Sequence, residues 1–212
     1  MIGFYNYTVI LTYMSLASSM LGIYFALGID GVGPSPRYAI ICLMISGLFD
    51  MFDGKIARTR KRTDDEKNFG IQIDSLCDLV CFGVLPSVIG YAVGMRHAGD
   101  MIILALFPLC AVIRLAYFNV TEESRQKKTS ETRKEYEGLP VTSVALILPL
   151  LYSFKNEIGV ENFSTVYGVF MIFIAIAFIT RFKMKKPGMK AMLGFIGIGV
   201  LELALLLYGT RR

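Results

Sequence analysis

Long runs of hydrophobic residues, separated by short polar stretches, make up most of this chain. Most runs approach the roughly 20 residues that a helix needs to cross the hydrocarbon core of a bilayer. The pattern predicts helices at residues 7–28, 37–57, 71–95, 100–119, 139–155, 162–181 and 189–208. The run at 139–155 is short, and Gly138 and Pro140 favour a helix start there. We therefore expect an all-α, polytopic membrane bundle of six core helices plus a seventh at the C-terminus, in a single domain over residues 1–212.

Composition supports a membrane protein, because 54% of the 212 residues are hydrophobic, which is too apolar for an ordinary soluble domain. The first run lacks a basic segment before it and a small-residue cleavage site, so we interpret it as a retained helix rather than a signal peptide. The four cysteines all lie inside predicted helices without a CxxC pair. They therefore indicate neither a disulfide framework nor a zinc site.

Lysine and arginine are concentrated in alternate loops, and this distribution predicts the orientation. Most of them follow the second, fourth and sixth predicted helices, at positions 58–67, 125–134 and 181–190. By the positive-inside rule, these loops and the N-terminus are cytoplasmic, in a multi-pass protein of the cell membrane. The polar stretch 121–137 is expected to be a loop on that side. The net charge of +5 then reflects topology and contact with anionic membrane lipids, not nucleic-acid binding.

Four aspartates lie in or beside two predicted helices, near the cytoplasmic ends. Asp50 and Asp53 are three positions apart, and Asp74 and Asp78 are four apart, so each pair lies on one helix face. An Asp at the centre of a membrane helix costs about 2.5 to 3.5 kcal/mol on insertion scales, so the charges need to be neutralised. Oxygen ligands at this density, without His or Cys, suit Mg²⁺ or Mn²⁺. Two such ions would support phosphoryl chemistry.

The main alternative is a cation or proton transporter, because acids inside membranes often serve such paths. Gly54 and Ala57 favour a different role, since they leave one flank of the helix almost without side chains, against which a bulky headgroup could lie. The same small residues are common where membrane helices pack closely. Taken alone, these two positions leave both interpretations open. Together with the four aspartates, they favour a headgroup site.

Two strings in the sequence carry a family resemblance. DMFDGKIAR, from Asp50 to Arg58, is followed by GIQIDSLCD, from Gly70 to Asp78. Together they resemble the signature of CDP-alcohol phosphotransferases, integral membrane enzymes that move a substituted phosphoryl group from a CDP-linked donor to an alcohol. Eleven residues separate Arg58 from Gly70, more than the family usually has. We therefore expect an extended loop at residues 60–67.

The resemblance implies roles for the four acids. Asp50, Asp53 and Asp74 would hold one divalent ion, and Asp50, Asp74 and Asp78 would approach a second. Asp78 would also be the catalytic base. The only histidine, His97, falls in a predicted external loop, which excludes a histidine base at a cytoplasmic site.

Contacts to the donor are also implied by the resemblance. The expected residues are small or polar and lie in or directly beside the first three predicted helices. They are Thr12, Ser15, Gly54, Lys55, Ala57, Arg58 and Gly70. Arg58 and Lys55 would equally serve as basic anchors at the membrane surface, and Thr12 and Ser15 would equally serve helix packing. Homodimerisation is the family expectation.

Segments 73–87, 114–119 and 137–141 resemble the family members that use CDP-diacylglycerol as donor and L-serine as acceptor, giving phosphatidylserine and CMP. Arg114 lies inside a predicted helix, and its guanidinium matches the serine carboxylate. A bridge to a structural acid or a reach to the interface would explain Arg114 equally well. Asn119 is a weaker candidate for the same pocket. Glycerol phosphate, inositol and inositol phosphate stay open as acceptors, although phosphorylated ones need more basic residues than the predicted helices supply.

Overall fold

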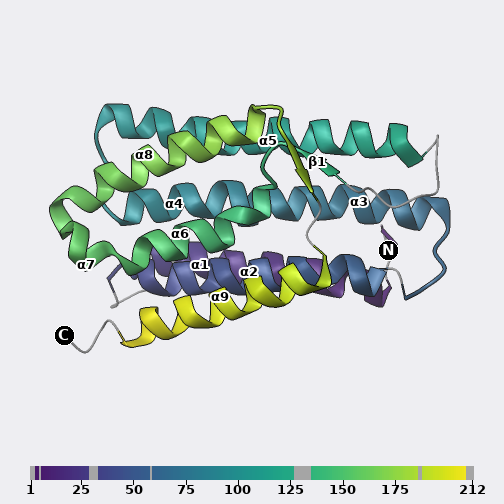
Figure 1. Ribbon diagram of the computed structural model, residues 1–212, viewed down its shortest axis with the longest axis horizontal. Helices are drawn as coiled ribbons and strands as arrows, with labels where there is room; N and C mark the ends of the chain where they lie inside the picture. Colours follow the sequence, from purple (N-terminus) through teal and green to yellow (C-terminus); the bar gives the residue numbers. More distant parts are fainter. Residues whose placement is uncertain are drawn as a thin grey trace.

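The computed structural model describes residues 3–4, 6–28, 33–57, 59–126, 135–185 and 188–208. Its helices run roughly along one long axis, as Figure 1 shows. The first half of the chain contains η1 (Tyr7–Val9), α1 (Ile10–Leu27), α2 (Pro36–Ala57), α3 (Asp64–Asp78), η2 (Leu79–Val84), α4 (Leu85–Ala92) and α5 (Ala98–Gln126). The second half contains β1 (Glu135–Glu137), η3 (Val141–Ser143), α6 (Val144–Ser153), α7 (Lys155–Ile158), α8 (Val160–Ile179), β2 (Lys183–Lys185) and α9 (Met189–Tyr208).

Every hydrophobic run predicted from the sequence is helical over most of its length, which confirms the all-α membrane bundle. Within the described residues, four helical stretches are long and apolar enough to cross a membrane by length and composition. They are Tyr7–Leu27, Asp64–Ala92, Ala98–Arg125 and Val160–Ile179. Val141–Ser153 and Ala191–Leu207 are shorter apolar helices. α2 is long enough but stands apart from the four, because Asp50, Asp53 and Lys55 make its last turns polar.

The third helical stretch begins well before the hydrophobic run does, so the loop expected at residues 60–67 is correct only for residues 60–63, and residues 64–67 are helical. α3 starts at Asp64, and the preceding Thr63 caps it. The Thr63 hydroxyl accepts a hydrogen bond from the Glu66 backbone N–H at 3.2 Å, and the Glu66 carboxylate accepts one from the Thr63 N–H at 2.9 Å. This reciprocal capping box satisfies two backbone donors that a helix start leaves open. It allows a polar sequence to begin a helix outside the apolar run.

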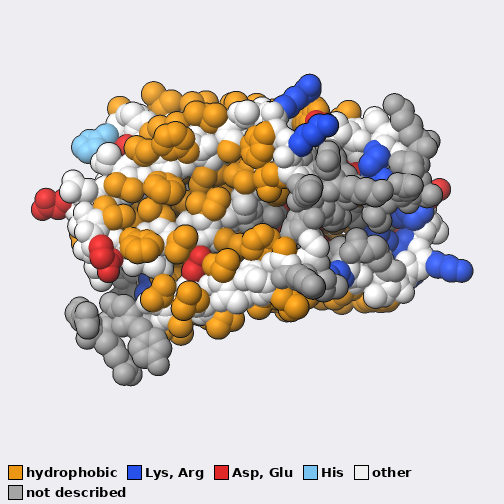
Figure 2. Space-filling model, in the orientation of Figure 1, with side chains coloured by type: hydrophobic (Ala, Val, Ile, Leu, Met, Phe, Trp, Pro, Cys, Tyr) orange, Lys and Arg blue, Asp and Glu red, His pale blue; other side chains and the backbone are white. Residues whose placement is uncertain are grey.

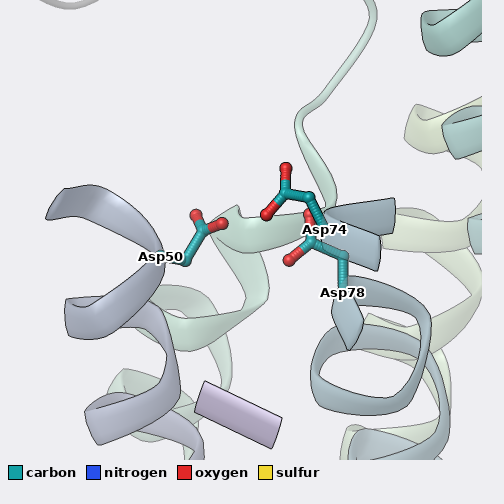
Figure 3. A group of neighbouring side chains, drawn as sticks. All are labelled: Asp50, Asp74 and Asp78. Atoms are coloured by element: carbon teal, nitrogen blue, oxygen red, sulfur yellow. The ribbon is translucent and has the colours of Figure 1, made fainter. Parts of the chain in front are cut away.

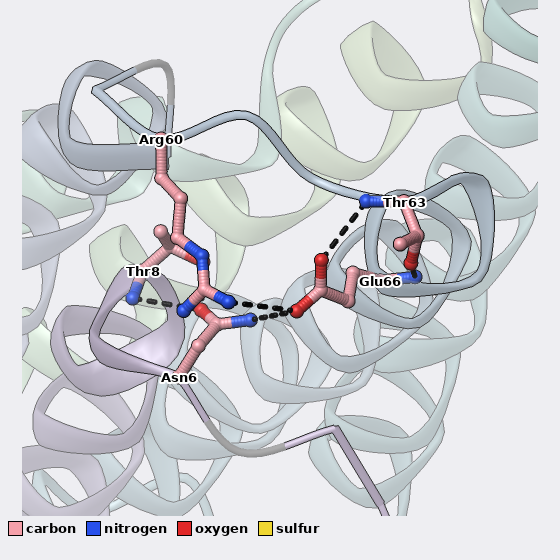
Figure 4. Close-up of polar contacts among 5 residues, drawn as sticks. All are labelled: Asn6, Thr8, Arg60, Thr63 and Glu66. Atoms are coloured by element: carbon pink, nitrogen blue, oxygen red, sulfur yellow. Dashed lines mark hydrogen bonds and ion pairs between the residues drawn. The ribbon is translucent and has the colours of Figure 1, made fainter.

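Glu66 also connects three parts of the chain (Figure 4). Its carboxylate accepts hydrogen bonds from the side chains of Asn6 and Arg60, both at 3.4 Å. Asn6 in turn caps η1 by accepting a bond from the Thr8 backbone N–H at 2.9 Å. The segment before α1 is thus joined to the start of α3 and to the connection between α2 and α3.

A π-helical segment, η2, joins α3 to α4 without a break in the helix. Pro86 lies at the start of α4 and has no N–H to donate. The carbonyl of Pro86 accepts a hydrogen bond from the Tyr167 hydroxyl on α8 at 3.0 Å. At Gly83 an added Cβ would lie 3.3 Å from the Cβ of Ala111 on α5. η2 therefore packs closely against α5, just beyond Asp78.

The interface between α1 and α2 is rich in serine. Ser15 donates to the backbone carbonyl of Ser46 at 3.1 Å, and Ser46 donates back to the carbonyl of Ser15 at 2.9 Å. Ser18 donates to the carbonyl of Cys42 at 3.0 Å. Small side chains let membrane helices approach closely, and hydrogen bonds between helices add to the packing. This pair of helices gives α2 a fixed position beside α1.

The polar stretch expected as a loop at residues 121–137 is more structured than predicted. α5 continues to Gln126, helped by a 2.6 Å ion pair between Glu122 and Arg125 on successive turns. Residues 127–134 lie outside the described residues. β1 then pairs antiparallel with β2, with Glu135 opposite Lys185 and Glu137 opposite Lys183. The connections before α6 and before α9 are therefore held together by backbone hydrogen bonds.

Candidate functional site

Three of the four predicted aspartates come together. Asp50, Asp74 and Asp78 each offer a carboxylate oxygen, and these oxygens lie within 4.8 Å of one another. Figure 3 shows Asp50 reaching from α2 towards Asp74 and Asp78 on α3. Asp74 and Asp78 share one helix face because they are one turn apart. Asp78 is only 9% exposed. We refer to Asp50, Asp74 and Asp78 as the acidic group.

The acidic group fits a divalent cation. Oδ1 of Asp74 is buried and has no hydrogen-bond partner among the described residues. A buried carboxylate oxygen without a partner is costly, and the negative charges of three neighbouring carboxylates repel one another. A cation between them would remove both penalties, and carboxylate oxygens are the ligands that hard divalent cations prefer. The structure therefore provides a site suited to a divalent metal.

Asp53 is not a member of the acidic group, but it lines the same cavity. The hydroxyl of Thr12 on α1 donates to Oδ2 of Asp53 at 3.4 Å. Asp53 lies three residues beyond Asp50, so the two side chains lie on the same side of α2. Its role as a metal ligand stays a prediction.

A cavity of about 790 Å³ extends from the acidic group. This volume lies within the range of about 300 to 1,000 Å³ that is usual for small-molecule sites. Its walls come mainly from α2, α3, α5, η3, α6 and α9 and are mostly apolar, and the lining includes the aspartates of α2 and α3. Gly54 lines it, and a Cβ added there would meet nothing within 4 Å among the described residues. The backbone of α2 is thus open to the cavity beside the acids, as the sequence predicted.

Lys55 and Arg114 line the cavity. Lys55 lies 5.2 Å above the ring of Phe52. Arg114 is 5% exposed; its Nε donates to the backbone carbonyl of Leu139 at 3.0 Å and its Nη2 to that of Gly138 at 3.4 Å. These bonds hold the turn that leads from β1 into α6 against α5. The guanidinium therefore supports the cavity wall as well as facing the cavity.

The other predicted contacts are placed less directly. Asn119 exchanges hydrogen bonds with Ser75 at 2.9 and 3.1 Å, next to Asp74. Ser15 takes part in the interface between α1 and α2. A Cβ at Gly70 would lie 3.1 Å from the guanidinium of Arg62. Among the described residues, the following predicted positions are not part of the cavity lining: Thr12, Ser15, Ala57, Gly70 and Asn119. Arg58 lies outside the described residues.

Sequence reasoning missed two features of the cavity. The first is α9, which contributes Met192, Phe195, Ile196, Gly199, Val200 and Leu203 to the lining. The second is Gly47, which also lines the cavity and lies where a Cβ would be 2.4 Å from the Cβ of Ala145 on α6. The apolar sequence of α9 gave no sign of which side faces a ligand. The pattern Gly47-x2-Asp50 was visible, but its partner on α6 was not.

The acidic group lies beside a large apolar cavity within a bundle of membrane helices. This arrangement defines a class of membrane protein that has a site suited to a divalent metal next to a cavity suited to an amphiphilic ligand. Comparison with known proteins is more specific. Residues 5–182 match the family model described as CDP-alcohol phosphatidyltransferase, and the chain belongs to this family. α9 lies beyond the matched residues.

Several curated proteins are similar to this chain. The CDP-diacylglycerol–serine O-phosphatidyltransferase of Saccharomyces cerevisiae is 38% identical over 130 residues, which cover 60% of this chain and 45% of that protein. The enzyme of the same name from Mycobacterium leprae is 28% identical, over 83% of this chain and 57% of its own length. The archaetidylserine synthase of Methanothermobacter thermautotrophicus is 32% identical, over 77% and 65%. The chain thus spans about half to two thirds of the length of these relatives.

Proposed function

We propose that the protein transfers the phosphatidyl group of CDP-diacylglycerol to L-serine, which gives phosphatidylserine and CMP. The observation that carries this proposal is the acidic group at the edge of an apolar cavity, because a CDP-linked lipid has a charged diphosphate joined to hydrocarbon chains. Family membership supports the CDP-linked donor. The Saccharomyces and Mycobacterium relatives are named as serine O-phosphatidyltransferases, which supports serine as the acceptor.

Asp50, Asp53, Asp74 and Asp78 are the proposed ligands of two divalent ions, Mg²⁺ or Mn²⁺. Bound there, the ions would neutralise the diphosphate and the charge that develops on the departing CMP. Asp78 accepts the proton of the serine hydroxyl as the hydroxyl oxygen bonds to the phosphorus that carries the lipid. The bond from that phosphorus to CMP breaks, and CMP leaves with the electron pair. A carboxylate suffices as base because the proton moves as the new P–O bond forms.

The donor headgroup is proposed to lie against α2 and the start of α3. Gly54 leaves the α2 backbone open beside the acidic group, and Lys55 supplies a positive charge at the cavity. Further donor contacts are proposed for Thr12, Ser15, Ala57, Arg58 and Gly70. The serine carboxylate is assigned to Arg114, with Asn119 nearby. Arg114 suits this role because its guanidinium has five N–H donors in one plane. The bonds to the carbonyls of Gly138 and Leu139 hold that plane in a fixed orientation.

The acidic group is proposed to lie on the cytoplasmic side of the cell membrane, with the N-terminus on the same side. The distribution of charge supports this orientation. Figure 2 shows Lys and Arg side chains gathered at the end of the molecule where α3 begins, as expected for a cytoplasmic end. We further propose that residues 1–212 act as a single domain and that two copies form a homodimer.

The test uses purified full-length protein in lipid nanodiscs with CDP-diacylglycerol. Release of CMP and the lipid product are measured with L-serine, glycerol 3-phosphate, inositol or inositol phosphate as acceptor. The proposal predicts serine-dependent CMP release and phosphatidylserine identified by mass spectrometry. CMP release with another acceptor but not with serine would move the protein to a different reaction of the same family. Absence of CMP release with every acceptor would overturn the proposed activity.

A further inference from the structure

The C-terminal helix α9 forms one side of the cavity although it lies outside the family-matched residues 5–182. It contributes apolar residues from three successive turns, and they are Met192, Phe195, Ile196, Gly199, Val200 and Leu203. α9 lies along α2 and α6, the helices that form the rest of this wall (Figure 1). None of the roles assigned above uses this helix.

The cavity is continuous from the acidic group to α9, so a ligand that fills it must be charged at one end and apolar at the other. The lining that contains the aspartates also includes Lys55 and Arg114, whereas the described α9 residues of the lining are all apolar or glycine. Replacement of water by hydrocarbon against such apolar surface is favourable and lowers the free energy of the complex. A hydrocarbon chain attached to a charged headgroup matches both ends.

We propose that α9 walls a site for a hydrocarbon chain of the donor lipid, and that Gly199 determines how much chain the site admits. The proposal rests on the proposed function, because the headgroup at the acidic group fixes where the chains begin. A Cβ at Gly199 would lie 3.9 Å from Cδ2 of Leu146 on α6, an ordinary contact distance. Gly199 and Leu146 both line the cavity. A large side chain at residue 199 must therefore extend into the space between α9 and α6.

α9 is anchored well enough to act as a fixed wall. Glu202 and Leu206 are only 1% and 5% exposed, so this stripe of the helix is buried. At the end of α9, Nη2 of Arg37 on α2 donates to the backbone carbonyl of Leu207 at 3.3 Å. A cation at a helix C-terminus also interacts favourably with the helix dipole. A substitution at the cavity face of α9 should therefore fill the cavity rather than displace the helix.

The test compares Gly199→Phe with Gly197→Phe. Gly197 is a matched control because it lies on the same helix, is exposed, and has no described atom within 4 Å of an added Cβ. CMP release is measured with CDP-diacylglycerol carrying eighteen-carbon or eight-carbon chains. Gly199→Phe should lower the ratio of long-chain to short-chain kcat/KM by about tenfold or more, in line with steric discrimination in apolar pockets. Gly197→Phe should leave the ratio within about twofold of wild type.

An unchanged ratio in Gly199→Phe, with the variant folded, would overturn the proposal. If that variant does not fold, a second measurement on the wild-type protein decides. A CDP-diacylglycerol analogue with a photoreactive diazirine at the end of one chain is activated in the nanodisc, and the labelled peptides are mapped by mass spectrometry. Label within residues 192–203 is expected. Label confined to α8 would overturn the site.

Competition separates the donor lipid from ordinary membrane lipid. Unlabelled CDP-diacylglycerol should reduce the label on α9 strongly, whereas the same amount of phosphatidylcholine should not. Equal competition by the two lipids would assign the α9 wall to bulk lipid and refute the proposal. Another outcome is that unlabelled CDP-diacylglycerol reduces the label on α9 although the protein releases CMP with no acceptor. That result would support the site for the hydrocarbon chain and refute the proposed reaction.

Discussion

Gly47→Ala tests whether close contact between α2 and α6 holds the acidic group in place. Gly47 lies on α2, about one turn before Asp50. A Cβ added at Gly47 would lie 2.4 Å from the Cβ of Ala145 on α6. Neither carbon can move aside, because each is fixed to its own backbone. The two helices must therefore separate to accommodate the new methyl group.

The size of the effect follows from this distance. Carbon atoms in contact lie about 3.5 to 4.0 Å apart, so α2 and α6 would have to separate by about 1 to 1.5 Å near residue 47. Overpacking of this kind typically destabilises a protein by about 1 to 3 kcal/mol. Misplacement of a reacting group by 1 Å can lower a rate by about 10². We therefore expect a lower Tm and CMP release reduced by about ten- to a hundredfold.

The decisive variant combines Gly47→Ala with Ala145→Gly, which removes the facing methyl group. Tm from circular dichroism and CMP release are measured for both single variants, the double variant and wild type. Ala145→Gly alone should cost about 1 kcal/mol, the usual penalty for glycine in a helix. The double variant should recover most of the activity that Gly47→Ala loses. Gly99→Ala, where an added Cβ meets no described atom within 4 Å, should behave like wild type. A double variant no better than Gly47→Ala would refute the reasoning.

Four further outcomes are expected. EDTA should abolish CMP release and added Mg²⁺ or Mn²⁺ should restore it; full activity in the chelator would contradict a metal site. Asp78→Asn should lower kcat by at least about 10² while the KM for the donor changes little. A loss of donor affinity in Asp78→Asn equal to that in Asp50→Asn and Asp74→Asn would make Asp78 a metal ligand only. Arg114→Lys should raise the serine KM about tenfold to a hundredfold, because the two-point guanidinium fork is lost; a rise in the donor KM alone would assign Arg114 to the diphosphate. Glu202→Leu should raise the Tm, since neither carboxylate oxygen of Glu202 has a hydrogen-bond partner among the described residues; a lower Tm would show that the carboxylate is paired.

Helix positions and the acidic group could be predicted because both depend on short-range regularities. Apolar runs report burial in lipid or in a core directly, and each one proved helical. Spacings of three and four fix which side chains share a helix face. Asp74 and Asp78 therefore had to point the same way. Their meeting with Asp50 followed from the cost of leaving such charges unneutralised in an apolar setting.

Features that depend on contacts between distant residues could not be predicted in the same way. Hydropathy marks where a helix enters the apolar layer and not where it begins, so α3 started earlier than expected. The Thr63 to Glu66 capping box was the overlooked local signal. The pairing of β1 with β2 joins residues far apart in the sequence and leaves no periodic pattern. The contact between Gly47 and Ala145 is equally long-range, and so is the place of α9 on the cavity wall.

The π-helical segment η2 has a consequence for how this protein tolerates insertions and deletions. In a π-helical turn each N–H bonds five residues back, so the turn holds one residue more than an α-helical turn. One residue corresponds to a rotation of about 100° in an α-helix. η2 therefore accommodates one extra residue between the face of α3 that carries Asp74 and Asp78 and the face of α4 that packs in the core. Loss of a single residue from Leu79–Val84 is expected to convert the π-helical turn into an α-helical one and to leave both faces in place, whereas loss of a residue from the α-helical part of α4 would rotate the rest of that helix by about 100°.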